Sequence, residues 1–571
     1  MDRTPENERK INIVGAGLAG LSAALTLSEA GLPSRLISVQ TSERAQSNLA
    51  EGGINACLNV MGEEDHVREH FTDTVRGGCD LADPNMAAGL CLAAPGIIRE
   101  LIEYGVPFQR EKGKIVQRNF GGQKKKRTAY VKSSTGKMIM AAMIDAVRRY
   151  ECEGLVERLS HHEFRQLVIK EGICSGVLVH DKFRGEDLVL SGTVILAAGG
   201  MNGMFPGQTT GSTANTGDAA AVLFAQGVEM ANLEMVQYHP TTVQIAGKRM
   251  LISEAARGEG GRLFYYGDGT DRAGSRGDER PKVRFMEDKY GEKGNLMPRD
   301  VVSREMAICG RQVFLDLTGL PDAAWEKKLS DLREEIIHYL AIDPQKEPVP
   351  VAPGIHFFMG GILIDEEHRT NVPGLYAAGE CACGYHGANR LGGNSLLAAI
   401  YGGKKAASEA AADQKRDQDR KQENAQGEKQ GPASVPEVSL DRAAGEFDEE
   451  VSQILIRSLP VLRCEAQLEE GLAGIRNLKK RMKDRNRDCG NTLPYCRVLL
   501  AEAVMLSAVK RKESRGAHFV REYPERSEAF RKTTAARCVH GNVEIEFKEI
   551  PALRDSVRLR LEEEGDTRGQ V

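Results

Sequence analysis

The first strong pattern of apolar and polar positions lies in residues 11–32, INIVGAGLAGLSAALTLSEAGL. A short apolar strand ends in a glycine-rich turn, and an alanine- and leucine-rich helix follows and stops at Gly31. In the turn, Gly15 permits a sharp bend, Gly17 lets the backbone approach a pyrophosphate, and Gly20 lets helix and strand pack closely. The N-terminus of the helix adds free N–H groups and a positive dipole. The segment therefore predicts a dinucleotide-binding site, in preference to a glycine turn that binds nothing.

Two later apolar strands end in small residues, TVILAAGG at 193–200 and VPGLYAAGE at 372–380. Such ends leave room for a ligand, and Glu380 is placed to accept hydrogen bonds from its hydroxyls, although it also fits a surface acid. The second strand, SRLISVQ, has Ser38 and Gln40 where nicotinamide sites carry an acid. The sequence has no second complete strand–GxGxxG–helix unit. We therefore expect FAD as the cofactor, and no direct reduction by a nicotinamide.

Beyond residue 232 the pattern changes twice. Residues 233–354 mix polar segments with helices such as PDAAWEKKLSDLREEIIHYLAI, which predicts an inserted domain. Residues 404–437 almost lack large apolar side chains and predict a solvated linker or a frayed helix. Apolar residues at three- and four-residue spacing then predict a helical bundle from segments 441–459, 465–483 and 495–515. The stretch HGNVEIEFKEIP alternates like an edge strand.

The chain has 571 residues, 41% hydrophobic and 28% charged, which is typical of a soluble globular protein of two or three domains. Its net charge of −4, with both signs interspersed, argues against nucleic acid as a partner. No stretch reaches the roughly 18 apolar residues of a membrane span, and the N-terminus lacks the apolar run of a secretory signal. We expect a cytoplasmic protein with no direct membrane span, or one held at the inner membrane surface by a partner subunit.

The twelve cysteines are scattered along the chain, and the most closely spaced pairs are Cys381 with Cys383 and Cys489 with Cys496. This spacing matches neither a zinc ribbon nor an iron–sulfur cluster. We therefore expect no metal site in the chain, so that any iron–sulfur cluster that serves it belongs to another subunit.

Five segments combine histidine or arginine with small residues: QYHPTTV, LISEAARGEGG, MPRDVVSRE, GIHFFMGGILID and YHGANRLGGNSL. Taken singly, His239 fits a turn, His356 a core position, and Arg299 the start of a helix. Taken together, two histidines and two arginines would form a site for a dianion, because arginine offers planar bidentate donors to carboxylates. The second arginine, Arg390, has only small neighbours, which leave its side chain free to reach a ligand.

These motifs resemble the flavoprotein subunits of succinate dehydrogenase and fumarate reductase, with L-aspartate oxidase as a close relative. The match runs along nearly the whole chain and includes VGAGLAGLSAAL, LAEGGINA, FGGQ, TANTGDAA, YHPTT, SEAARGEGG, MPRD, HFFMGGI and GLYAAGECACGYHGANRLGGNSL. The resemblance implies an α/β fold with a doubly wound FAD-binding domain, an inserted α+β capping domain and a C-terminal helical domain. The implied boundaries are 1–232 and 355–403 for the FAD-binding domain, 233–354 for the capping domain, 404–437 for a charged linker, 438–540 for the helical domain and 541–571 for a C-terminal segment.

The resemblance also implies roles for single residues. Arg299 matches the proton donor, and Glu254 and Arg257 match the relay that resupplies its proton. The residues that match the dicarboxylate site are His239, Ser253, His356 and Arg390. The residues that match flavin contacts are Gly15, Gly17, Gly20, Ser38, Gly52, Gly53, Asp218, Glu380, Ser395 and Leu396. The implied reaction is hydride transfer from FAD N5 to one alkene carbon of fumarate while the arginine protonates the other, or the reverse.

Two positions depart from the family's patterns. L-Aspartate oxidases resemble EGGH where this chain has FGGQ, so Phe120 replaces the acid that partners the substrate ammonium, which favours a dicarboxylate without an amino group. Membrane-bound members resemble SHTVSAQGG, and alignment on the glycine pair puts Gln46 where their histidine is bonded to the flavin. Because glutamine has no nucleophilic ring nitrogen, we expect noncovalent FAD, a lower flavin potential and fumarate reduction as the working direction.

Three functions stay open at this point: fumarate reduction or succinate oxidation, aspartate oxidation to iminoaspartate, and a flavin-binding redox sensor or assembly factor. The third would leave the dianion site without a purpose, and reductases of other enoates keep the substrate open within the first. Since the chain has no cluster cysteines and no haem motif, its electrons must come from a partner. We expect an iron–sulfur subunit, a flavin carrier or another soluble electron donor.

Overall fold

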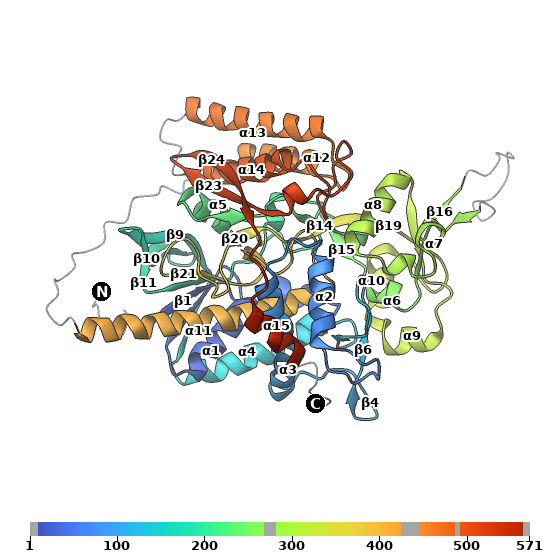
Figure 1. Ribbon diagram of the computed structural model, residues 1–571, viewed down its shortest axis with the longest axis horizontal. Coiled ribbons are helices and arrows are strands. Elements are labelled where there is room, and N and C mark those ends of the chain that lie inside the picture. Colours follow the sequence, from blue (N-terminus) through green and yellow to red (C-terminus); the bar gives the residue numbers. More distant parts are fainter. Residues whose placement is uncertain (1–9, 268–280, 424–444, 486–491, 564–571) are drawn as a thin grey trace.

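The computed structural model describes residues 10–267, 281–423, 445–485 and 492–563 (Figure 1). At its centre lies a five-stranded sheet in which all neighbouring strands pair in parallel. Its order is β21-β12-β1-β2-β8, from β1 (Ile11–Val14), β2 (Ser34–Ser38), β8 (Val156–Ser160), β12 (Val194–Leu196) and β21 (Leu375–Ala377). The chain thus moves outward from β1 on one side and returns to its other side at β12, which is the doubly wound arrangement. The predicted fold class is confirmed.

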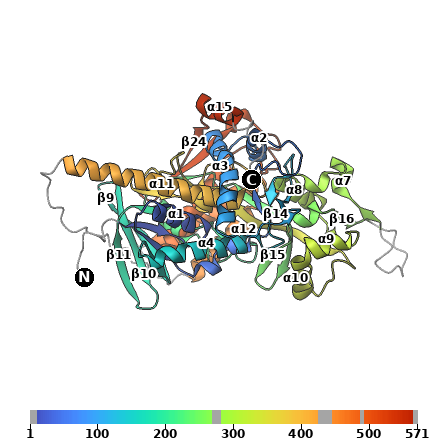
Figure 2. The same cartoon turned by 90° about the horizontal axis from the view of Figure 1, so that it is seen from below.

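The strands at the middle of this sheet are buried along their whole length, and β1 and β12 carry apolar side chains at nearly every position, as a sheet covered on both faces requires. Helices pack against this sheet and against one another. They are α1 (Leu18–Glu29), α3 (Pro84–Glu103), α4 (Thr135–Cys152) and α11 (Asn394–Glu423). Figure 2 shows α1 and α11 side by side. A three-stranded antiparallel sheet also belongs to this part of the molecule, formed by β9 (His162–Lys170), β10 (Ile173–Asp181) and β11 (Glu186–Ser191).

Helix α11 changes one sequence prediction. Residues 404–423, predicted as the first part of a charged linker or of a frayed helix, continue this helix without a break, as the second alternative requires. Three alanines at 406, 407 and 410 are buried there, and a Cβ on Gly403 would come 2.2 Å from the carbonyl oxygen of Ala19 in α1. Small side chains allow the two helices to approach closely, and alanine has the strongest intrinsic helix propensity. The rest of the predicted linker, residues 424–437, lies outside the described residues.

The elements between Val236 and Phe358 form a separate α+β body at the right of Figure 1. Its six-stranded sheet has the order β15-β14-β19-β18-β16-β17, from β14 (Val236–Ile245), β15 (Lys248–Leu251), β16 (Arg262–Tyr266), β17 (Lys282–Val283), β18 (Val313–Asp316) and β19 (Val349–Phe358). Its helices are α6 (Ala255–Gly258), α7 (Phe285–Tyr290), α8 (Arg299–Cys309), α9 (Asp322–Lys327) and α10 (Ser330–Leu340). A second apolar core, which includes Trp325, Leu315 and Ile336, holds this body together.

Three stacked helices form the top of the molecule in Figure 1: α12 (Gly445–Ser458), α13 (Glu465–Arg485) and α14 (Leu493–Lys510). The predicted helical domain extended to residue 540, but α14 ends at Lys510 and β23 (Lys532–Val539) lies before that boundary. β23 pairs with β24 (Asn542–Glu549) and with β13 (Met230–Ala231). This sheet has the order β22-β20-β13-β23-β24, with β20 (Gly361–Leu363) and β22 (Ala382–Cys383), so its strands come from distant parts of the chain. The helix α15 (Asp555–Glu563) follows and packs on α3.

The remaining elements are short or lie at the surface. They are β3 (Ile54–Asn55), β4 (Arg110–Glu111), β5 (Lys114–Ile115), β6 (Gln117–Arg118), β7 (Thr128–Ala129), α2 (Val67–Gly77) and α5 (Asp218–Ala225). By length and composition alone, α3 could cross a membrane, but most of it is buried inside the protein. The core helix of a folded domain passes the same test, so we assign α3 to the core.

Candidate functional site

One cavity of about 500 Å³ runs from the carboxyl end of the central sheet to the α+β body. It opens at the switch point between β1 and β12, where doubly wound folds bind their ligands. Of the residues predicted for the cofactor, the dianion and the proton relay, all but Gly20 and Arg257 line this cavity. The structure therefore brings together segments that lie up to 381 residues apart in the sequence, from Gly15 to Leu396.

The nucleotide-binding turn has the geometry that its glycines predict. Gly15 has a φ of +117°, and a Cβ there would come 2.1 Å from the carbonyl oxygen of Ala197. A Cβ on Gly20 would come 1.8 Å from the carbonyl oxygen of Gly15, so helix and strand touch at this point. At Gly17, by contrast, an added Cβ would lie 3.6 Å from its nearest neighbour, and the side chain of Ser47 accepts from the first N–H group of α1, that of Leu18. The next N–H groups at the start of α1 face space that an anionic group can occupy.

The other predicted cofactor residues lie along the same cavity. The hydroxyl of Ser38, at the end of β2, donates to the carbonyl oxygen of Gln40 at 2.7 Å. Asp218 begins α5, and its carboxylate already accepts from Arg497 of α14 at 2.6 Å. Glu380 accepts from the backbone N–H of Phe358 at 3.1 Å. The remaining predicted residues of the lining are two glycines after a 3-10 turn and two residues of the first turn of α11: Gly52, Gly53, Ser395 and Leu396.

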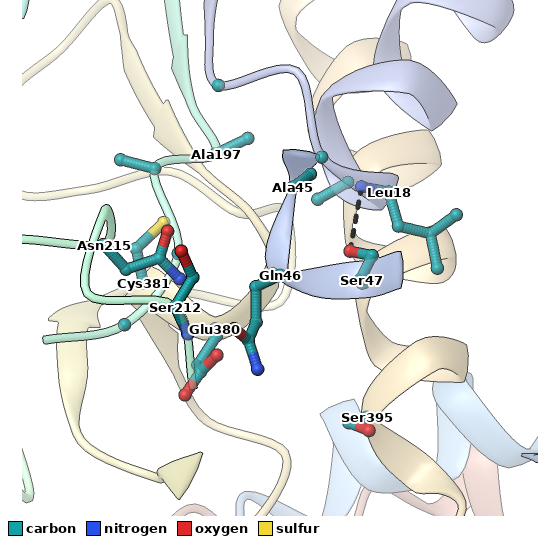
Figure 3. A pocket seen from close by; sticks show the side chains of 18 of the residues that line it. Leu18, Ala45, Gln46, Ser47, Ala197, Ser212, Asn215, Glu380, Cys381 and Ser395 are labelled. Atoms are coloured by element: carbon teal, nitrogen blue, oxygen red, sulfur yellow. Dashed lines mark hydrogen bonds between the residues drawn. The ribbon is translucent and has the colours of Figure 1, made fainter. Parts of the chain in front are cut away.

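Gln46 lies on a 3-10 turn, Gln46–Leu49, at the wall of the cavity. Its side-chain oxygen accepts from the backbone N–H of Ser212, and Figure 3 shows its side chain extending toward Ser212 and Glu380. The next residue, Ser47, accepts from the N–H of Leu18 at 3.3 Å. The turn is therefore tied both to the start of α1 and to the segment after β12.

At the other end of the cavity, cationic and ring side chains from three separate segments converge. His239 comes from β14 and His356 from β19, and their ring centroids are 5.2 Å apart. The guanidinium of Arg390 lies 4.3 Å from the ring centroid of Phe357, and its Nε is buried without a hydrogen-bond partner. Burial, and then the charge of Arg299, lower the pKa of Arg390 and of both histidines well below their usual values. Both rings are therefore neutral near pH 7 in the free protein.

Glu254 connects two arginines behind this cluster. Its Oε2 accepts from Arg299 Nε at 2.9 Å, and its Oε1 accepts from the N–H of Gly121 at 2.7 Å. Arg257 Nη2 lies 3.6 Å from Oε1, and Arg257 Nη1 donates to the carbonyl oxygen of Asn295. Burial raises the pKa of Glu254, but the two arginines more than offset this and leave it below its usual value. The predicted relay is thus a continuous, buried chain of charged groups, and its carboxylate is ionised.

Ser253 lies just before this chain and also lines the cavity, where its hydroxyl is within 3.4 Å of the N–H of Ala255. Among the described residues, no group of three or more histidine, cysteine, aspartate or glutamate side chains could hold a metal ion.

Comparisons with known proteins agree with this geometry. Residues 11–396 match the family model described as an FAD binding domain, and residues 448–560 match the model described as the fumarate reductase flavoprotein C-term. The succinate dehydrogenase flavoprotein subunit of Bacillus subtilis is 36% identical over 578 residues, which cover 95% of this chain and 97% of that protein. The chain belongs to the succinate dehydrogenase/fumarate reductase flavoprotein family.

Two further relatives show the breadth of this flavoprotein family. L-Aspartate oxidase 2 of Ralstonia nicotianae is 35% identical over 532 residues, which cover 90% of this chain and 91% of that protein. The solved structure of E. coli quinol fumarate reductase superposes with a TM-score of 0.79 at 27% identity, and covers 95% of this chain and 97% of that chain. These relatives agree with the family assignment, and they leave the substrate open between succinate or fumarate and aspartate.

The residues of the cavity also fit the family's FAD. The N–H groups at the start of α1 suit a pyrophosphate, and the turn before it has no room for a Cβ at Gly15. Gly200 is equally constrained, since a Cβ there would come 2.6 Å from Glu380 Oε1. Glu380 lies beside the turn with a carboxylate that can accept from ribose hydroxyls.

Sequence reasoning missed several residues of this flavoprotein's site. Phe357 supports the Arg390 guanidinium, and His386 packs edge-on against the same ring at 5.3 Å. Gln237, two residues before His239 in β14, is bonded to Arg299 Nη1 at 3.2 Å. Each lies within four residues of a predicted site residue, so the segment itself was predicted. The residue was missed because an uncharged aromatic or amide side chain does not stand out in a sequence.

Glu380 provides a test of the cavity by pH. Burial raises its pKa from 4.5 to about 7, so ionisation of this carboxyl destabilises the FAD-free protein. The penalty is absent below pH 4.5 and fully present above about pH 7, where it amounts to about 3 kcal/mol. We expect FAD-free Glu380→Gln protein to be more stable than wild type at pH 8 and equally stable at pH 4.5, as measured by urea unfolding. A constant difference at both pH values would contradict the assignment.

Proposed function

We propose that this chain is a flavoprotein subunit that reduces fumarate to succinate. The observation that carries the proposal is a pair of buried arginines, Arg299 and Arg390, in one cavity with two histidines. Arg390 forms no ion pair within the described residues, and Glu380 and Glu254 favour its charge only from a distance. A buried, unpaired cation is costly, and a bound carboxylate is the natural compensation. A C4-dicarboxylate would bring a second negative charge for the histidine side of the cluster.

Dianion binding also has a consequence for His239. Its Nδ1 lies 3.2 Å from the carbonyl oxygen of Thr241, which can only accept, so this nitrogen carries the hydrogen. In the neutral ring, Nε2 is then an acceptor and cannot donate to a carboxylate. A bound dianion would favour the imidazolium form, and we infer that substrate binding takes up a proton at this ring.

The proton side of the reaction follows from the buried chain. FAD, when bound, supplies the two-electron chemistry. Glu254 holds Arg299 at Nε and Gln237 holds it at Nη1, so that Nη2 can present an N–H to a substrate carbon. Glu254 is positioned to return a proton to Arg299, and Arg257 stands behind it with two nitrogens that have no hydrogen-bond partner. General acid catalysis of this kind contributes about 10²–10⁴-fold to a rate.

The direction of the reaction is the direct test of this proposal. We expect the FAD-loaded protein to reduce fumarate with a reduced viologen dye at least about tenfold faster than it oxidises succinate with an acceptor dye. The reason is that a flavin without a covalent histidine link has a lower potential, and succinate is a poor reductant. Faster succinate oxidation would reverse the direction, and no turnover of either compound would refute the dicarboxylate proposal.

L-Aspartate oxidation is the second candidate, because an aspartate oxidase is among the relatives. Phe120 argues against it, since this ring is buried at the cavity wall and packs beside Gly52 and Gly392. It offers no charge to a substrate ammonium. Aspartate oxidation that exceeds fumarate reduction under matched conditions would favour this candidate.

We propose that the FAD is held without a covalent bond. Gln46 is the residue aligned with the linking histidine of membrane-bound members, and its side chain bonds Ser212 instead. We expect trichloroacetic acid to precipitate a colourless protein and to leave all of the flavin in the supernatant. A yellow pellet after washing would show a covalent bond at another residue. The same measurement on Gln46→Ala protein controls for retention by that turn.

We further propose that electrons reach this subunit from an iron–sulfur subunit or another electron donor. The described residues hold no metal-binding cluster that could pass electrons within the chain. The E. coli relative is named a quinol fumarate reductase, and a similar arrangement would place this chain on the cytoplasmic face of the inner membrane through a partner.

A further inference from the structure

One amide side chain connects the two arginines of the proposed site. Gln237 Oε1 accepts from Arg299 Nη1 at 3.2 Å. Its Nε2 donates to Asn389 Oδ1 at 2.8 Å and to the carbonyl oxygen of Arg390 at 2.9 Å. The side chain is fully buried and does not line the cavity, so it does not reach a substrate.

We infer that Gln237 is a positioning residue that fixes the proton donor Arg299 relative to the carboxylate clamp Arg390. The inference rests on the proposed function, since it assigns Gln237 to the same site. It concerns how two like charges are held at a set spacing before a dianion arrives.

The orientation of the amide follows from its partners. Arg299 has only donors, so it must face the oxygen of Gln237. The carbonyl of Arg390 has only an acceptor, so it must face the nitrogen. Asn389 is oriented independently, because its Nδ2 donates to the carbonyl oxygen of Gly77 at 3.1 Å and leaves its Oδ1 for Gln237. A flipped amide would lose all three bonds.

Each arginine is also held from a second side. Glu254 binds Arg299 Nε at 2.9 Å, and the ring of Phe357 supports the guanidinium of Arg390 at 4.3 Å. Gln237 links the two arginines to each other. Its side chain is the bond that strand β14 provides between Arg299, at the start of α8, and the loop that carries Arg390.

The neutrality of this residue matters as much as its bonds. A glutamate of the same shape could also accept from Arg299, but its charge would neutralise one of the cations that the dianion needs. It would also face the oxygens of Asn389 and Arg390 without a hydrogen to donate. A neutral amide holds both cations and leaves their charge to the substrate.

Two substitutions separate these roles. Gln237→Leu removes the bonds and adds no charge, so we expect kcat for fumarate to fall about 100-fold, the effect of a misplacement of about 1 Å. The dissociation constant of malonate, a dicarboxylate that does not react, should rise less than about tenfold. Gln237→Glu should weaken malonate binding about 100-fold at pH 8 and regain most of it at pH 5.5, where the new carboxyl takes up a proton. Flavin absorbance changes report malonate binding.

Wild type measured at the same pH values corrects for proton uptake at His239 and His356. The matched control is Gln117→Leu, which removes a buried amide that donates to the carbonyl oxygens of Ala56 and Arg127 outside the cavity. The control should lose stability while its kcat and malonate affinity stay within twofold of wild type.

The inference is overturned if both Gln237 variants match the control, or if both change kcat and malonate affinity by one common factor at every pH. Should Gln237→Leu fail to retain FAD, Gln237→Met, an unbranched side chain without the amide, is measured in its place. Loss of FAD from both would show a role in the fold and would also overturn the inference. Wild type that neither binds malonate nor reduces fumarate would instead refute the proposed function itself.

Discussion

Arg299→Ala is expected to lower kcat for fumarate reduction by about 10³–10⁴-fold while FAD content and malonate binding stay close to wild type. The barrier would rise by about 4–5 kcal/mol, the upper part of the range that a positioned general acid supplies. Malonate binding is retained because Arg390 and the histidines stay in place, and because removal of one of two neighbouring cations relieves their repulsion. Steady-state kinetics with a viologen dye and malonate titration of the flavin spectrum give the two numbers.

Arg390→Ala is the matched comparison, since it also removes one buried arginine from the same cavity. It should weaken malonate binding by about 30-fold or more, because truncation of one partner of a buried charge pair costs about 2–5 kcal/mol. A catalytic acid and a clamp thus differ in which constant they change. If both variants keep near-normal turnover, neither arginine belongs to the reaction centre.

Gly20→Ala is expected to abolish retention of FAD. The added Cβ would lie 1.8 Å from the carbonyl oxygen of Gly15, a backbone atom that cannot move without opening the nucleotide-binding turn. We expect at least a tenfold fall in the flavin-to-protein ratio after gel filtration, and a loss of about 1–3 kcal/mol of unfolding free energy from overpacking.

Gly31→Ala is the control for that substitution. Gly31 ends the same helix region and has a φ of +70°, but no atom lies within 4 Å of a Cβ placed there. It should cost about 1 kcal/mol from backbone strain and leave FAD content unchanged. A yellow Gly20→Ala protein with a full complement of FAD would show that the turn does not bind the nucleotide.

The sequence predicted those parts of the fold in which one local pattern has one physical solution. Glycines at 15, 17 and 20 after a buried strand predicted the turn, and the structure confirms that 15 and 20 have no room for a side chain. Helix α11 was predicted only in part, since residues 404–423 lack large apolar side chains and left a solvated linker and a frayed helix both open. Three of their alanines are buried because α11 packs against distant elements such as α1 and α3, and such long-range contacts leave no mark on the local pattern.

The candidate site was predicted through charge, and its neutral supports were missed for the same reason. Arg299 and Arg390 lie in glycine- or proline-containing segments where a cation is conspicuous. Gln237 and Phe357 belong to ordinary strand patterns, and an amide or an aromatic ring in such a pattern does not indicate a functional site. Their role depends on register, since Gln237 is the partner of Phe357 across β14 and β19. Register between strands more than 100 residues apart is set by the whole fold and is not visible locally.

The five-stranded sheet that includes β13 and β23 sets the order in which the protein can be completed during synthesis. Its strands are made between residues 230 and 549, so the ribosome must release almost the entire chain before the sheet closes. The segment just before β23 holds the loop of Arg390, because the N–H of Ala517 donates to the carbonyl oxygen of Ala388 at 2.9 Å. The strands of the nucleotide site are complete by residue 377, some 140 residues earlier than that contact. A nascent chain therefore acquires the elements for its cofactor first and the final shape of its anion clamp last.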